Sequence, residues 1–201
     1  MRILSFSLKL ILLALVATIV MPGCKDDEPT PDTARIHGTI TFENADLWST
    51  WKDSGDVEVT IFPEFVLAFP PQGAGWGTVP NDFFGPGAPG GTFPLGAPSN
   101  ASNPFILTYV PGQTQYQYEL EVDPGTYSAL AVGLRHDRIT DPTLKTATLG
   151  VHWNHPDSVS HGIVFNFTPL NYPAPSTITV AKGDNVEINF KADFAFVEVW
   201  F

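Results

Sequence analysis

The clearest hydrophobic pattern in the chain lies between residues 116 and 134. From 116 to 122, apolar and polar residues alternate, which is the period of a strand with one face in a core and one in water. Asp123–Gly125 then predicts a turn, because proline presets φ and glycine accepts a positive φ. Tyr127–Leu134 is apolar on both faces, which indicates a central strand that is covered on both sides.

Similar patterns predict further strands along the chain, and no helix is expected after the N-terminal segment. The last eight residues, 194–201, are apolar on both faces apart from Glu198, so they predict a strand that is either central or an edge needing a neighbour. About nine short strands separated by turn signals favour an all-β, antiparallel Greek-key β-sandwich. The other predicted strands cover residues 36–42, 57–61, 105–110, 147–153, 163–167, 178–180 and 186–190.

Two stretches read as loops that carry aromatic residues. Residues 43–55 are polar but include Trp48 and Trp51. Residues 70–104 are rich in proline and glycine, which exclude a helix or a central strand there. A loop of this length is usually functional or disordered. Its aromatic residues either anchor the loop to the core or form a binding surface, and the sequence leaves both alternatives open.

The N-terminus has the features of a targeting segment. Arg2 is followed by an apolar run over residues 10–20, and Gly23 precedes Cys24, which is the single cysteine of the chain. We expect residues 1–23 to be removed, residues 24–33 to form an acidic tether, and residues 34–201 to form one β-sandwich domain. A lone cysteine cannot form an internal disulfide.

The position of Cys24 resembles the lipidation site of bacterial lipoproteins, although Met21 and Pro22 depart from the usual residues before that cysteine. Lys25 followed by three acidic residues, 26–28, is similar to the surface-export signal of Bacteroidetes-type lipoproteins. The resemblance implies a lipid anchor in the outer membrane, with the outer face favoured over the periplasmic face. Two or more acyl chains anchor a protein stably, whereas one chain is marginal.

The charge of the chain excludes some partners. It has 10 Lys and Arg against 21 Asp and Glu, a formal net charge of −11. Removal of residues 1–23 takes away Arg2 and Lys9, which leaves 8 basic and 21 acidic residues and a net charge of −13. Such a chain is a poor partner for nucleic acid or for an anionic membrane surface.

Two segments carry a resemblance to a known fold family. Val122–Tyr127, an acidic residue and Pro-Gly-Thr-Tyr after a strand, resembles the carboxypeptidase regulatory-like, transthyretin-like group of seven-stranded Greek-key sandwiches. The strand Ile36–Ile40, with its glycine, also fits that group. The long loop over residues 70–104 departs from it. The Tyr-Arg-Gly-Ser signature of the transthyretin-related hydrolases is missing, so their activity is not implied.

Candidate chemistry is sparse. The sequence has no Gly-x-Ser-x-Gly elbow, phosphate loop or His-Glu-x-x-His motif, and lipidation would consume its only thiol. We therefore expect neither an enzyme nor a cofactor. His152, His155 and His161, with an acid such as Asp157, have ligand types that suit a zinc-like ion. Histidines scattered in a loop are the commoner interpretation.

The sequence favours a non-catalytic cell-envelope lipoprotein, whose β-sandwich binds or scaffolds another component. Its expected partners are the membrane, through the lipid anchor, and a glycan or an envelope protein, but not nucleic acid. One alternative is a carbohydrate-binding accessory protein that stacks sugars on exposed rings, with Trp48, Trp51, Trp76, Phe83 and Phe84 as candidates. Another is a protein partner reached through a C-terminal strand at residues 194–201.

Overall fold

The computed structural model describes the chain in several stretches from residue 31 onward. Pro31–Phe201 forms one compact unit. The strand predicted over residues 163–167 lies outside the described residues. None of the helices in the described part is long and apolar enough to cross a membrane. The described residues are 31–64, 75–79, 91–95, 97–98, 100–140, 145–153 and 175–201.

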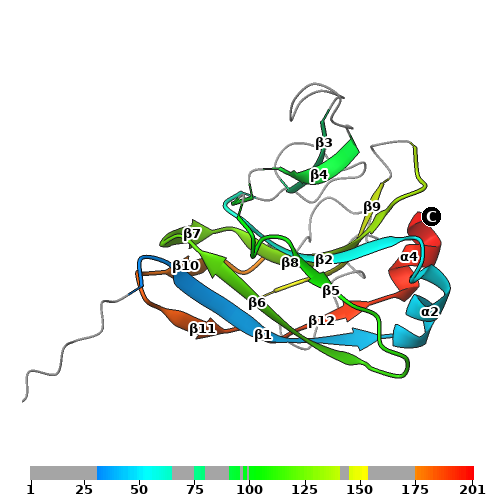
Figure 1. The fold of residues 1–201 in the computed structure, drawn as a ribbon, viewed down its shortest axis with the longest axis horizontal. Coiled ribbons are helices and arrows are strands. Elements are labelled where there is room, and N and C mark those ends of the chain that lie inside the picture. Colours follow the sequence, from blue (N-terminus) through cyan, green and yellow to red (C-terminus); the bar gives the residue numbers. More distant parts are fainter. Residues whose placement is uncertain are drawn as a thin grey trace, which may run out of the picture. The chain divides into compact units, whose positions relative to one another are not determined.

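The first sheet is built around β1 (Ala34–Glu43), as Figure 1 shows. On one side, β6 (Gln115–Val122) pairs antiparallel with β1. On the other side, β11 (Asn185–Glu187) and β12 (Phe190–Asp193) run parallel to β1 in a single register. The sheet is therefore mixed, where only antiparallel pairing was expected. The one strand predicted over residues 186–190 is interrupted after β11.

The second sheet has the order β5-β2-β8-β9, and all its pairs are antiparallel. Its strands are β2 (Gly55–Phe62), β5 (Phe105–Leu107), β8 (Ala129–His136) and β9 (Thr146–Val151). The side chains of β8 from Ala129 to Leu134 are all buried, so the prediction of a central strand covered on both faces is confirmed. β5 is shorter than the strand expected there.

One hydrophobic core lies between the two sheets. Alternate residues of β1 and β6 point into it, as the period-2 pattern predicted. The second sheet contributes alternate residues of β2 and β8 from the other side. The all-β sandwich predicted from the sequence is therefore confirmed. Its most deeply buried members include Ile36, Ile40, Val57, Val59, Ile61, Leu120, Leu130, Leu134 and Leu149.

The chain changes sheets at Ser128. β7 (Gly125–Tyr127) pairs with β10 (Ile178–Val180), whereas β8 begins at the next residue after Ser128 and belongs to the second sheet. The amide of Ser128 donates to the carbonyl of Phe62 at 2.8 Å. The Tyr127 hydroxyl donates to the carbonyl of Asp123 at 2.8 Å and closes the turn before it. The single strand expected over residues 127–134 is thus two strands.

Residues 70–104, expected to be a loop, contain two strands within their described part. β3 (Gly75–Val79) and β4 (Gly91–Leu95) pair antiparallel as a separate two-stranded sheet. Trp76 lies opposite Pro94 in that pair. A two-stranded ribbon tolerates proline, since each strand has one side without a ladder partner. The proline content therefore excluded a central strand there but did not exclude a strand.

The C-terminal segment is a helix, which corrects the strand predicted over residues 194–201. α4 (Ala195–Trp200) follows β12 directly. Asp193 Oδ1 accepts the amide hydrogen of Ala195 at 2.7 Å and the side-chain amide of Asn44 at 2.8 Å, which fixes the start of the helix. A short apolar run does not distinguish a buried strand from a buried helix. The hypothesis of a partner reached through a C-terminal strand therefore fails.

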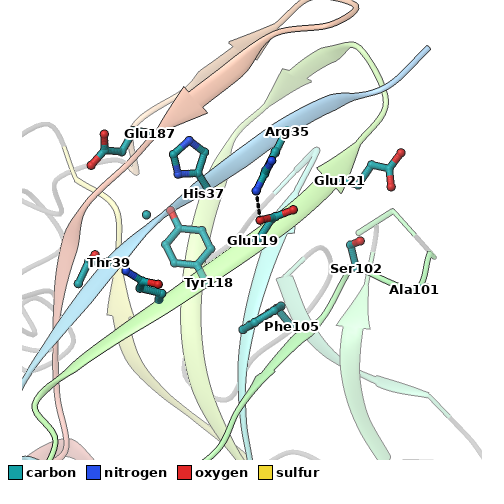
Figure 2. Close-up of a pocket in the computed structure, with 12 residues that line it drawn as sticks. Arg35, His37, Thr39, Ala101, Ser102, Phe105, Tyr118, Glu119, Glu121 and Glu187 are labelled. Carbon is teal, nitrogen blue, oxygen red and sulfur yellow. Dashed lines mark hydrogen bonds and ion pairs between the residues drawn. The ribbon is translucent and has the colours of Figure 1, made fainter. Parts of the chain in front are cut away.

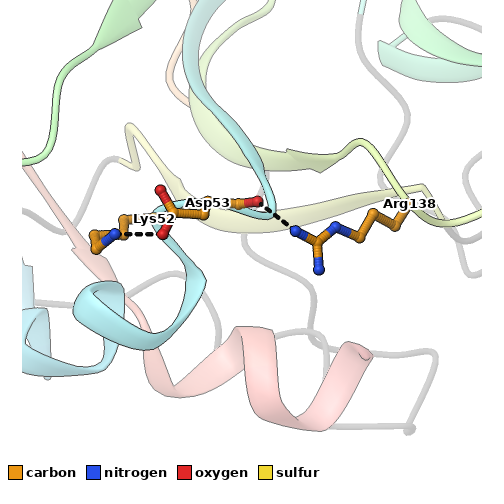
Figure 3. A network of polar contacts seen from close by, with 3 residues as sticks. All are labelled: Lys52, Asp53 and Arg138. Carbon is orange, nitrogen blue, oxygen red and sulfur yellow. Dashed lines mark hydrogen bonds and ion pairs between the residues drawn. The ribbon is translucent and has the colours of Figure 1, made fainter.

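A second helical segment replaces the polar loop expected over residues 43–55. η1 (Ala45–Leu47) and α2 (Trp48–Trp51) form two short turns after β1. Figure 3 shows the polar contacts that follow them: Lys52 forms an ion pair with Asp53, and Arg138 donates to the carbonyl of Asp53 at 3.3 Å. The bond from Arg138 fastens the residues after α2 to those after β8.

Candidate functional site

Two of the aromatic residues proposed as sugar-stacking rings are packed inside the protein. Trp48 is only 2% exposed, and its ring lies 4.8 Å from that of Phe194 and 4.9 Å from that of Tyr116. Trp51 is partly buried against His136 and Phe201, at ring distances of 5.8 and 5.7 Å. The hypothesis that Trp48 is an exposed platform is wrong, because its ring is part of the core.

The structure does not describe the side chains of the other three proposed sugar-stacking residues. Trp76 lies on β3, but its side chain is outside the description, and Phe83 and Phe84 lie outside the described residues. The five candidate rings are therefore not brought together by the part of the chain that the structure describes. A stacking role for Trp76, Phe83 or Phe84 stays a prediction.

The proposed histidine site also lies mostly outside the description. His152 is half-buried and its ring lies 6.5 Å from that of Phe190, while burial lowers its pKa. His155 and His161 are outside the described residues. Among the residues that are described, no cluster of three His, Cys, Asp or Glu suits a metal ion. The metal site therefore stays a prediction.

A hollow among the described residues lies on the outer face of the first sheet (Figure 2). It measures about 740 Å³. Arg35, His37 and Thr39 of β1 line it, because they alternate with the core residues of that strand and face outward. Gln117, Glu119 and Glu121 of β6 line it for the same reason. Glu187 of β11 completes the polar floor.

The register of the three strands places carboxylates on both sides of one histidine. His37 lies opposite Glu119 of β6 and opposite Glu187 of β11. Figure 2 shows Glu119 turned toward Arg35, with which it forms an ion pair. Both partners of that pair are about half exposed, so the pair contributes little to stability, at most about 1 kcal/mol.

A firmly held segment, residue 98 with residues 100–105, forms the remaining wall. Asn103 is 4% exposed, and its side chain accepts from the Ile61 amide at 3.1 Å and donates to the Pro98 carbonyl at 2.9 Å. Asn100 donates from its side chain to the carbonyl of Glu121 at 3.2 Å. The segment is thus fastened to β2 in the second sheet and to β6 in the first.

A second hollow of about 420 Å³ adjoins the first and shares Ala101, Ser102 and Glu121 with it. Thr33 and Asp123 line its far end. We call the two hollows together the β6 groove, formed by residues 33–39, 98, 100–105 and 117–123 and by Glu187.

The β6 groove is acidic. Four carboxylates line it, against one guanidinium from Arg35, which gives a formal net charge of −3 with His37 neutral. Two of these carboxylates accept hydrogen bonds that fix their positions: Glu121 from the Thr33 hydroxyl at 2.6 Å, and Glu187 from the Asn189 side chain at 3.0 Å.

Such a lining suits cationic groups and hydrogen-bond donors, and it repels anions. The groove was not predicted from the sequence. The signal was present in the polar residues that alternate with core residues in β1 and β6, but their pairing across strands needs the register.

A further ionisable residue lies away from the groove. Glu58 on β2 points to the face of the second sheet opposite the shared core and is 6% exposed. The pKa of Glu58 is raised to about 7, chiefly by burial; Arg135 opposes the shift, and nearby Asp56 and Asp137 add to it. Within the described part of the chain, Glu58 Oε2 has no hydrogen-bond partner. Because Glu58 lines neither hollow of the β6 groove, we interpret it as a determinant of stability.

Replacing Glu58 by glutamine is expected to remove a pH dependence. The folded protein holds the Glu58 proton up to about pH 7, whereas the unfolded chain releases it above the usual pKa of 4.5. The protonated Glu58 therefore gives its full contribution to the free energy of unfolding below pH 4.5, and this contribution is lost as the pH rises through 7. The Glu58→Gln protein should therefore be more stable than the wild type above pH 7, by up to about 3 kcal/mol. Urea unfolding at pH 4.5 and pH 8.5 measures the difference.

The matched control for this test is Glu198→Gln, because Glu198 is an exposed carboxylate on α4. Its stability difference from the wild type should not change with pH. His136 and His152, whose pKa values burial lowers, act equally in all three proteins and cancel. A Glu58→Gln difference that is the same at both pH values would contradict the burial of an ionisable carboxyl.

Comparison with known proteins gives no match: no protein-family model fits the chain, and no curated protein or solved structure is similar to it.

Proposed function

We propose that the chain is a non-catalytic binding module of the bacterial cell envelope. Acyl groups on Cys24 hold it at the outer membrane, on the outer face, and the β6 groove is its binding surface. The observation that carries the proposal is the position of Cys24. It directly follows the apolar leader, and the chain enters β1 only at Ala34.

The tether places the groove near the membrane. Residues 25–33 span at most roughly 30 Å when extended. Thr33, the last tether residue, lines one end of the β6 groove. The Gly183 amide donates to the Thr33 carbonyl at 3.0 Å, and Asp32 forms an exposed ion pair with Lys182, so the end of the tether lies against the folded unit. A groove at this distance from the bilayer favours another envelope component as its partner.

The likeness to the transthyretin-like, Greek-key sandwiches belongs to the same proposal. Its motif, Val122–Tyr127, lies where the chain leaves the first sheet. The hydrogen bond from the Tyr127 hydroxyl to the Asp123 carbonyl gives the tyrosine of that motif a structural role. Disulfides play no part in this fold, since the chain has one cysteine.

A glycan ligand is the second candidate. The carboxylates of the groove accept hydrogen bonds from hydroxyl groups, and Phe105 offers a partly buried ring beside them. A glycan array tests this candidate: binding that is lost in Trp76→Ala places it on the β3–β4 pair, and binding that is lost in Glu119→Gln places it in the groove. An array without any signal removes it.

The anchor has its own test. In a detergent phase-partition assay the wild type is expected in the detergent phase, and the Cys24→Ser variant in the aqueous phase, because two acyl chains bury enough methylene groups for stable anchoring. Thermal unfolding of both proteins serves as the control, since Cys24 precedes the compact unit. A wild-type protein that partitions into the aqueous phase would refute the anchor.

A further inference from the structure

The free edge of β6 presents unpaired peptide groups to the β6 groove. The Phe42 amide donates to the Thr114 carbonyl at 2.8 Å, so the even-numbered residues of β6 direct their peptide groups toward β1. The odd-numbered residues direct theirs away from β1. The bond from Asn100 to the Glu121 carbonyl confirms this direction at one end of the strand.

Within the described chain, two residues on that edge, Gln117 and Glu119, have outward peptide groups that are free to accept a further strand. The Glu121 carbonyl is occupied by Asn100, and the Gln115 carbonyl accepts from Gln113 at 2.7 Å. Between them, the outward peptide groups of Gln117 and Glu119 meet no partner within the described part of the chain. An edge of this kind is a template for an added strand.

The charge around the open edge selects the occupant. Glu119 and Glu121 project from β6 to the outer face, and Asp123 follows at the end of the strand. An added strand would place alternate side chains beside these carboxylates, because side chains directly opposite on paired strands share a face. Lysine or arginine at every second position would match them.

We propose that the β6 groove binds an extended, basic peptide segment, which pairs with the edge of β6 at Gln117 and Glu119. This inference rests on the proposed function, since it names the class of partner for that binding surface. The peptide hydrogen bonds supply affinity, and the carboxylates on the outer face select alternating positive charge.

A second copy of the chain is a poorer occupant of this edge. Two β6 edges that paired antiparallel would bring Glu119 and Glu121 of each copy beside those of the other. Like charges directly opposite on paired strands are destabilising. Charged side chains on an edge strand also prevent such self-pairing, and the same carboxylates that exclude a second copy attract a basic segment.

The test uses the full-length protein purified in a non-ionic detergent and an eight-residue probe of alternating lysine and threonine with blocked ends. We expect the probe to bind, and binding to weaken as salt is added. Two matched peptides serve as controls. An alternating glutamate–threonine peptide reverses the charge, and a lysine–threonine peptide N-methylated at every amide has no N–H to donate to a strand edge. Neither control should bind.

Variants of the chain test separately the two features of the site, the open peptide groups of β6 and the carboxylates beside them. Gln117→Pro removes an outward N–H that is not used in the pairing with β1, so it should abolish binding and leave the ladder to β1 in place. Glu119→Lys together with Glu121→Lys should weaken binding by about tenfold, the size expected when two exposed charge pairs are reversed. Glu198→Lys on α4 is the charge control and should bind like the wild type.

Hydrogen exchange gives a readout that does not depend on affinity alone. The amides of Gln117 and Glu119 should exchange more slowly when the lysine–threonine peptide is bound. Unchanged exchange at both amides, equal binding of the N-methylated peptide, or no binding of the basic peptide would overturn the proposal. Binding to glycans alone, or self-association through β6, would also overturn it. None of these outcomes touches the phase-partition test of the anchor, so the two proposals can fail separately.

Discussion

The Gly38→Ala variant is expected to lose about 3 kcal/mol of unfolding free energy, the upper end of the usual cost of overpacking, because the added methyl would clash with the backbone. A Cβ at Gly38 would lie 1.8 Å from the Ile188 carbonyl oxygen and 2.6 Å from its carbon. The carbonyl cannot easily move. It accepts the Tyr118 hydroxyl at 2.8 Å, and the Ile188 amide donates to the His37 carbonyl at 2.8 Å.

Gly125→Ala is the matched control for this substitution. A Cβ at Gly125 meets no atom within 4 Å, so its stability should stay within about 1 kcal/mol of the wild type. Urea unfolding of the three proteins measures both effects. If Gly38→Ala were as stable as Gly125→Ala, the close approach of Ile188 to β1 would be wrong, and with it the parallel pairing of the last strands.

Trp48→Ala is expected to destabilise the protein by about 3 to 5 kcal/mol, the usual cost of removing a large buried aromatic side chain. The Trp48 ring contacts those of Phe42, Tyr109, Tyr116 and Phe194 at centroid distances between 4.8 and 5.8 Å. Its removal would leave a cavity where η1 and α2 close one end of the core. Denaturant unfolding followed by circular dichroism measures the loss.

The control for Trp48 is Trp48→Phe, which keeps an aromatic ring and should cost clearly less than the alanine change. If Trp48 were an exposed sugar-binding residue, the Trp48→Ala protein would keep its stability and lose ligand binding. A stable Trp48→Ala protein would therefore contradict the buried position of this residue and would restore the stacking hypothesis.

Half-buried strands were the part of the fold that the sequence predicted best. In β1 and β6, every second residue is apolar and the intervening ones are polar, so periodicity alone indicates both the strand and its inner face. The central position of β8 followed from apolar residues on both of its faces. These are patterns that one strand carries by itself.

Features that depend on contacts between segments far apart in the sequence could not be predicted in this way. The change of sheet at Ser128 and the parallel pairing of β11 with β1 depend on which strands meet. The start of α4 depends in part on the contact of Asp193 with Asn44, which is far away in the sequence, so no local pattern shows it. The β6 groove arises only when the register brings His37 between two carboxylates from strands far apart in the sequence.

The proposed lipid-anchored function depends most on the fate of Cys24. The intact mass of the protein extracted from membranes tests it most directly. We predict a chain that begins at Cys24 and carries acyl groups on that residue, with no residues from 1–23. An unprocessed chain, or a mature chain with a free Cys24 thiol, would contradict the lipid-anchored function.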